Sequence, residues 1–125
     1  MKICVTSSGN TLDALVDPRF GRAAYLTIVD SESMAFEVVP NAAAGAMGGA
    51  GIQAAQTLAN RGVSVLITGN VGPNAFQALK SSGVKIVVGA SGTIREVIEK
   101  FKRGGLKETG SPTVEGHFGK FNRGR

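Results

Sequence analysis

Two short apolar runs, each bounded by glycines, constrain the fold of this chain most strongly. Residues 62–69 (GVSVLITG) and 83–89 (GVKIVVG) echo each other, and both are almost continuously apolar. That pattern is typical of parallel strands buried on both faces. A helix is predicted between them, because Pro73 suits a first helical turn and Gly83 suits the position after a helix. Strand, helix and strand in this order predict a right-handed crossover in a parallel sheet.

Three further strands are predicted before this unit. Residues 2–7 form an apolar strand pattern, and residues 25–30 and 34–39 are rich in β-branched, aromatic and other apolar side chains. The short turn at 30–33 predicts that the latter two strands form an antiparallel hairpin. The expected fold class is therefore α/β, with a mixed five-stranded sheet in the order 3-2-1-4-5, an antiparallel second strand, and helices on its faces.

Two more helices complete the pattern. One is predicted at residues 52–61, with four residues expected to be buried: Ile52, Ala55, Leu58 and Ala59. The last helix begins with a capping box from Thr93 to Glu96 and carries a single apolar stripe. The periodicity ends after Lys102. We therefore expect one domain, residues 1–102, which would bind the cofactor discussed below.

The remaining residues, 103–125, have a different composition. They carry five Lys or Arg residues against two Asp or Glu residues, a net charge of +3, and they are rich in glycine. Few of them are apolar, so we expect a basic, flexible tail.

The chain has one cysteine, Cys4, so it cannot form an intrachain disulfide. No run approaches the roughly 20 apolar residues of a membrane span, and the first strand pattern begins at Lys2 without signal-peptide anatomy. These features predict a cytoplasmic protein without membrane contact.

Glycine-bearing turns follow the parallel strands or precede the helices. They are Ser7–Asn10, Gly48–Gly51, Gly69–Pro73 and Ala90–Thr93. In an open α/β sheet such turns gather beyond the carboxyl ends of the strands, and helix N-termini there offer N–H groups to an anion. Arg19 and Arg22 add two guanidinium groups that could bind an anion, although the local sequence slightly favours a surface ion pair with Asp17 or Asp13.

Catalytic and metal-ligating patterns are missing from the sequence. Cys4 lies within a strand and is expected to be a buried small hydrophobe. His117 is the only histidine, so neither a zinc site nor a hydrolytic triad is indicated. Met47 offers a thioether that suits a soft metal such as copper, but a loop methionine without a role is the favoured interpretation. The chain is therefore not expected to be an enzyme.

Four motifs in order give the chain a family resemblance. They are Phe20–Ala23, Gly49–Ile52 with Ala55 and Gln56, Gly69–Ala75, and Gly83–Ile86. On these motifs, residues 1–102 resemble the dinitrogenase iron–molybdenum cofactor-binding family, whose members are nitrogenase accessory factor-like proteins. The resemblance implies a ribonuclease H-like three-layer fold. It also implies non-covalent binding of a molybdenum-containing metal–sulfur cluster, of the Fe–Mo–S type or of the Mo–Cu–S type found in the orange-protein branch.

The resemblance also implies which residues face the cluster. Members often have His just before the Gly-Ala-Gly-Ile motif, where this chain has Gly48. Binding would then depend on main-chain N–H groups, arginine charge and shape, with no side-chain metal ligand. Adding the turn after the first strand, the expected cofactor-binding residues are Ser8, Gly9, Asn10, Arg19, Phe20, Gly21, Arg22, Met47, Gly48, Gly49, Ala50, Gly51, Gly69, Asn70, Gly72 and Pro73.

The function expected is that of a cofactor carrier or scaffold, with cofactor-assembly or redox proteins as partners. An alternative is a protein- or nucleic-acid-interaction module that acts through the tail, where aromatic and basic side chains interleave: Phe118, Lys120, Phe121, Arg123 and Arg125. Nucleic acid is the less expected partner. A nuclease is disfavoured because Asp13, Asp17 and Asp30 are not grouped at one strand end.

Overall fold

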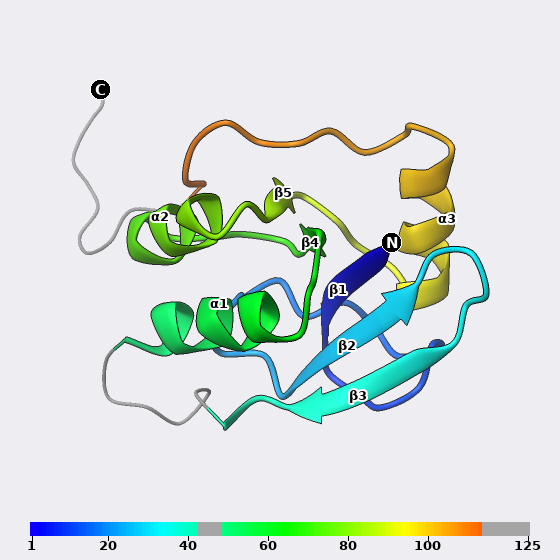
Figure 1. Cartoon of the computed structure of the whole chain (residues 1–125). Coiled ribbons are helices and arrows are strands. Elements are labelled where there is room, and N and C mark those ends of the chain that lie inside the picture. The colour runs from blue at the N-terminus through cyan, green and yellow to red at the C-terminus, as the bar shows by residue number, and fades with distance from the viewer. Residues whose placement is uncertain (43–48, 114–125) are drawn as a thin grey trace.

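The computed structural model describes residues 1–42 and 49–113 of the chain (Figure 1). Within these ranges, three consecutive strands are followed by helices that alternate with two further strands: β1 (Lys2–Ser7), β2 (Tyr25–Asp30), β3 (Phe36–Pro40), α1 (Ala50–Asn60), β4 (Val65–Ile67), α2 (Pro73–Ser81), β5 (Lys85–Val87) and α3 (Ile94–Lys102).

The strands form one sheet in the order β3-β2-β1-β4-β5. β2 runs antiparallel to both β1 and β3, whereas β4 is parallel to both β1 and β5. The predicted strand order, the antiparallel second strand and the ribonuclease H-like α/β class are thereby confirmed. The two similar apolar runs predicted β4 and β5 correctly because both strands are buried between layers of helices, which requires apolar side chains on both faces.

Helices cover both faces of the sheet (Figure 1). Helices α1 and α2 pack on one face, over a core that includes Cys4, Leu58 and Leu79. Helix α3 packs on the other face with Ile3 and Val5. Because alternate residues of β1 point to opposite faces, this central strand contributes to both cores.

Three local features differ from the sequence predictions. β3 begins at Phe36, because Met34 adopts a left-handed conformation (φ 63°) and its N–H donates to Asp30 O across the turn at 2.8 Å. Helix α1 begins at Ala50, two residues early. Ile52 is 38% exposed and Ala59 is exposed, so the prediction that both are buried was wrong. The buried stripe of α1 instead consists of Ala50, Ala54, Ala55 and Leu58.

Residues 103–113, which we call the strap, lie against the domain. The N–H of Thr109 donates to Ile86 O at 2.7 Å, Glu108 forms an antiparallel bridge with Val87, and Leu106 packs on the α3-side core. The expectation of a flexible tail therefore does not hold for the strap, and its remainder, 114–125, lies outside the described residues. In the described ranges, no helix has the length and apolar character needed to cross a membrane.

Candidate cofactor-binding site

Three glycine-bearing segments meet beyond the carboxyl end of β4. Asn70 N donates to Pro18 O at 2.8 Å, and Phe20 N donates to Asn70 O at 3.4 Å, so the turn after β4 lies beside residues 18–20. Residues 19–22 in turn approach the start of α1, whose first turn packs on the first turn of α2. We call residues 19–22, 49–51 and 69–73 the amide site.

Glycine permits the close contacts within the amide site. Gly21 has φ 94°, and a Cβ on it would lie 3.1 Å from the Gly51 main chain. A Cβ on Gly51 would lie 2.8 Å from the Ala75 Cβ, and a Cβ on Gly69 would lie 2.5 Å from the Pro18 Cα. Because glycine has no side chain, three backbone segments can lie in direct contact here, and two of them carry helix N-termini.

The two helices that meet here begin without side-chain caps. Neither Gly49 nor Gly72, at the N-cap positions of α1 and α2, makes a capping hydrogen bond, and neither first turn contains an acidic residue. Helix α3 differs, because Thr93 and Glu96 form the predicted capping box. Its hydrogen bonds hold the pKa of the Glu96 carboxyl below its usual value. Uncapped N-terminal N–H groups carry a partial positive charge and favour an anion.

The two arginines of the amide site have different surroundings. Arg19 pairs with Asp17, with its Nε 3.3 Å from Asp17 Oδ1, so the ion-pair interpretation of Arg19 holds. Asp17 is itself largely buried, and its carboxylate accepts a hydrogen bond from the Arg19 main-chain N–H at 2.9 Å. This bond fixes the backbone conformation at the start of the 19–22 segment. Arg22 is exposed at the far end of the segment. It belongs to the same segment as Gly21, which approaches the main chain of Gly51 in the first turn of α1.

Ser8, Gly9 and Asn10 form a turn that is held within its own loop, because Ser8 N donates to Leu15 O at 3.0 Å and Ser7 Oγ donates to Gly9 O at 2.9 Å. Their loop continues along α3: Val16 N donates to Gly92 O at 2.9 Å, and Ile94 N donates to Ala14 O at 3.0 Å. This loop joins the turn after β1 to the turn at 90–93 on the α3 side, and the convergence of all four turns on one site stays a prediction. Sequence order alone does not show which face a long connection crosses. Met47 and Gly48 lie outside the described residues.

Asn41 is a supporting residue that sequence analysis missed. Its side chain is buried, and Nδ2 donates to Gly21 O at 3.2 Å and to Ala23 O at 3.0 Å. Behind the same segment, Thr6 Oγ1 donates to Asp17 O at 2.7 Å and lies 2.7 Å from Thr68 Oγ1. The only sequence signal for Asn41 is a polar residue directly after a strand that ends in proline.

Cys4 is fully buried in the core beneath α1 and α2, as expected. Burial raises the pKa of its thiol far above the ordinary value, because the thiolate would be desolvated. We predict that a disulfide-exchange reagent reacts with native protein roughly a hundredfold more slowly than with protein unfolded in guanidinium chloride. Rapid reaction of the native protein at neutral pH would contradict the buried position.

Among the described residues, no three or more His, Cys, Asp or Glu side chains group as a metal site.

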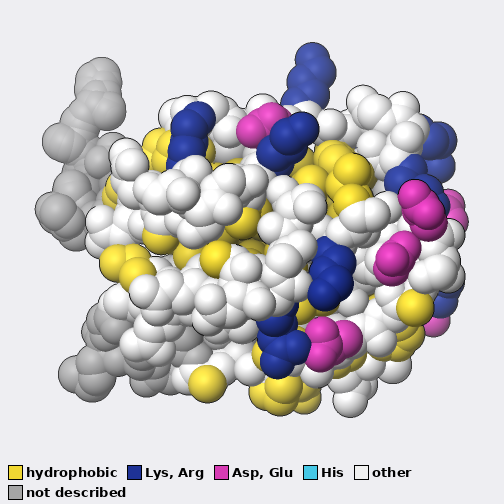
Figure 2. Space-filling model, viewed as in Figure 1, with side chains coloured by type: hydrophobic (Ala, Val, Ile, Leu, Met, Phe, Trp, Pro, Cys, Tyr) yellow, Lys and Arg dark blue, Asp and Glu magenta, His cyan; other side chains and the backbone are white. Residues whose placement is uncertain are grey.

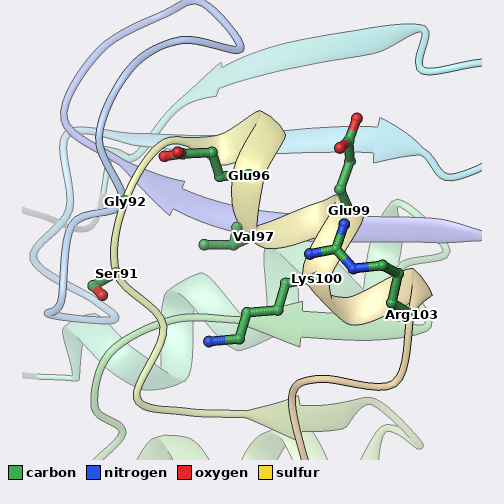
Figure 3. Close-up of a pocket in the computed structure, with 7 residues that line it drawn as sticks. All are labelled: Ser91, Gly92, Glu96, Val97, Glu99, Lys100 and Arg103. Carbon is green, nitrogen blue, oxygen red and sulfur yellow. The ribbon is translucent and has the colours of Figure 1, made fainter.

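A pocket of about 410 Å³ lies on the α3 side, away from the amide site (Figure 3). Its charged lining residues are Glu96, Glu99, Lys100 and Arg103. Figure 3 shows the Lys100 ammonium pointing across the pocket toward the loop that carries Ser91. Because its two basic and two acidic side chains balance, this pocket suits an anionic guest less well than the amide site does.

Lys and Arg side chains on the face shown in Figure 2 are scattered among Asp and Glu side chains. A nucleic-acid interface normally gathers basic side chains into a stripe or patch. The described part of this face has no such patch.

The fold and the amide site define a small α/β domain that presents helix N-termini and guanidinium groups at one end of its sheet. The model of the dinitrogenase iron-molybdenum cofactor family matches residues 1–104, and the chain belongs to this family. The resemblance inferred from the four motifs is thus confirmed.

Individual relatives agree with this assignment. The apo form of the orange protein from Desulfovibrio gigas is 46% identical, with a TM-score of 0.87, and the match covers 90% of this chain and 95% of that one. A Thermotoga protein of the DUF35 family, provisionally named NifB, is 43% identical with a TM-score of 0.80, over 92% of this chain and 98% of that one. An uncharacterised Methanocaldococcus jannaschii protein is 32% identical over 86% of this chain and 91% of its own length.

Proposed function

We propose that this protein binds an anionic molybdenum-containing metal–sulfur cluster non-covalently at the amide site and acts as a carrier or scaffold for it. The observation that carries the proposal is the contact between two helix N-termini without side-chain caps, against which Gly21, the neighbour of Arg22, also packs. Membership in a family described by the iron-molybdenum cofactor, and similarity to the orange protein, support the choice of guest.

The donor groups present in the amide site fit such a guest. Its described residues offer main-chain N–H groups and guanidinium N–H groups, and no thiolate or imidazole. Sulfur atoms on the surface of an anionic cluster accept hydrogen bonds of this kind, so the cluster can be bound and released without breaking a metal–ligand bond. Reversible binding suits exchange with cofactor-assembly or redox proteins, which we propose as partners.

Titration of the apo protein with tetrathiomolybdate, with and without Cu(I), tests this function. We expect a stoichiometric change in visible absorbance and a higher melting temperature, because a ligand that binds only the folded state stabilises it. A response that requires Cu(I) would favour the Mo–Cu–S type of cluster. If spectrum and melting temperature stay unchanged in both arms, and added iron–molybdenum cofactor also fails to bind, the proposed function is wrong.

Replacing Arg22 by Gln should weaken tetrathiomolybdate binding by about tenfold, the effect of losing one hydrogen bond to a charged group. The measurement is the dissociation constant from the absorbance titration. Lys100→Gln is the matched control, because it removes one exposed positive charge from the α3-side pocket. Equal weakening by both substitutions would indicate a general charge effect and would argue against a specific role for Arg22.

A further inference from the structure

The strap connects the end of α3 to the amide site. It leaves α3 at Arg103, passes along the outer edge of β5 and reaches the turn that precedes α2 (Figure 1). The hydrogen bond from Thr109 N to Ile86 O holds its middle. Thr113, at its end, is the last described residue.

Thr113 contacts both polar groups of one residue in the amide site. Val71 N donates to Thr113 Oγ1 at 2.8 Å, and Thr113 N donates to Val71 O at 2.9 Å. Val71 lies between Asn70 and Gly72, the N-cap residue of α2. Since Asn70 is bonded to residues 18 and 20 on its other side, the turn is clamped between two segments that are distant in sequence.

From these contacts we propose that Thr113 is a positioning residue, which holds the 69–73 turn in the form that binds an anion. This inference rests on the proposed function and extends it to residues beyond 104, where the family match ends. Val71 is buried as a whole residue, so its N–H and C=O groups have little access to water as an alternative partner. The Thr113 hydroxyl fixes the orientation of the Val71 N–H, and thereby of the Asn70–Val71 peptide, whose carbonyl accepts from Phe20 N. The Thr113 N–H, bonded to Val71 O, fixes the next peptide, which leads into α2.

Because the Thr113 contacts already hold the 69–73 turn in one conformation, less conformational entropy is lost when an anion binds. The affinity for the anion is therefore higher. The coupling acts in both directions, because a ligand that favours the clamped turn must also stabilise strap docking by the same factor. Binding at the amide site and attachment of the strap are then linked.

Thr113→Val tests the role of the hydroxyl, because it keeps the shape and the Thr113 N–H but removes the Oγ1 acceptor. Two measurements are made on the full chain: hydrogen exchange of the Val71 amide without ligand, and the dissociation constant for tetrathiomolybdate. We expect exchange at Val71 to be about tenfold faster and binding to be about fivefold weaker, the range of one neutral hydrogen bond. Thr113→Ser retains the hydroxyl and should restore both values.

Thr109→Val is the matched control, because among the described residues the Thr109 hydroxyl bonds within the strap, to Ser111. It should leave Val71 exchange and affinity unchanged. Normal binding by Thr113→Val would overturn the positioning role while leaving the proposed function intact. If the wild-type protein itself fails to bind tetrathiomolybdate and the iron–molybdenum cofactor, the proposed function fails and the positioning role with it. Faster Val71 exchange in Thr113→Val would then establish the clamp as a structural contact alone.

Discussion

Gly69→Ala is expected to lower the free energy of unfolding by about 2–3 kcal/mol and the melting temperature by roughly 10 °C. The added methyl group would lie 2.5 Å from Pro18 Cα, 2.6 Å from Pro18 Cβ and 2.9 Å from Pro18 O. These are backbone and ring atoms, which cannot rotate away as a flexible side chain can. The turn must therefore separate from residues 18–20, and we expect tetrathiomolybdate binding to be lost. Thermal unfolding and absorbance titration measure the two effects.

The matched control for this substitution is Gly110→Ala. Gly110 has no positive φ, and a Cβ on it would meet no atom within 4 Å. Its replacement should therefore leave melting temperature and binding close to those of the wild type. A stable, fully binding Gly69→Ala protein would show that the turn and residues 18–20 do not make this close contact.

Asn41→Ala is expected to destabilise the protein by about 2–4 kcal/mol and to weaken cluster binding. The substitution removes the donor for Gly21 O and Ala23 O, and it leaves two buried carbonyl groups without this partner. The segment that carries Arg19 and Arg22 then loses its anchor to the end of β3. Denaturant unfolding gives the change in stability, and the titration gives the change in affinity.

Asn60→Ala provides the comparison, because Asn60 is exposed at the end of α1. That substitution should change stability by less than about 0.5 kcal/mol, as is usual for surface positions. If Asn41→Ala were equally mild, water would have to satisfy the Gly21 and Ala23 carbonyls. The hydrogen bonds of the Asn41 side chain would then have little importance for the 19–22 segment.

The sheet was predictable from sequence because its order depends on which segments are apolar on two faces and which on one. Val65–Ile67 and Lys85–Val87 carry that signal, and the short turn at 30–33 carries the hairpin. Ile52 was mispredicted because helical periodicity fixes the spacing of a buried stripe but not its phase when the start of the helix is uncertain. Because Gly51 packs against Ala75 of α2, the face of α1 that carries Ala50, Ala54 and Leu58 is buried, and Ile52 lies outside that face.

The site was only partly predictable. Glycine and arginine motifs singled out residues 19–22, 49–51 and 69–73, which the structure brings together, because close backbone approach requires glycine. Their role in binding stays a prediction. The hydrogen bonds of the 8–16 loop to residues 92–95 at the start of α3 were not predictable, since they depend on the path of a long connection. The strap was missed because most of its bonds to the domain come from main-chain groups, which any sequence possesses. Only Thr113 contributes a side-chain bond to the turn, and a lone threonine is no signal.

The two edges of the sheet differ in a way that affects self-association. The outer edge of β5 is bridged by Glu108, whereas no bridge to the outer edge of β3 occurs within residues 1–42 and 49–113. A sheet with one open edge can pair with a second copy only once, and growth stops at a dimer. If the strap were detached, each molecule would present two open edges, and pairing could continue from copy to copy into a filament.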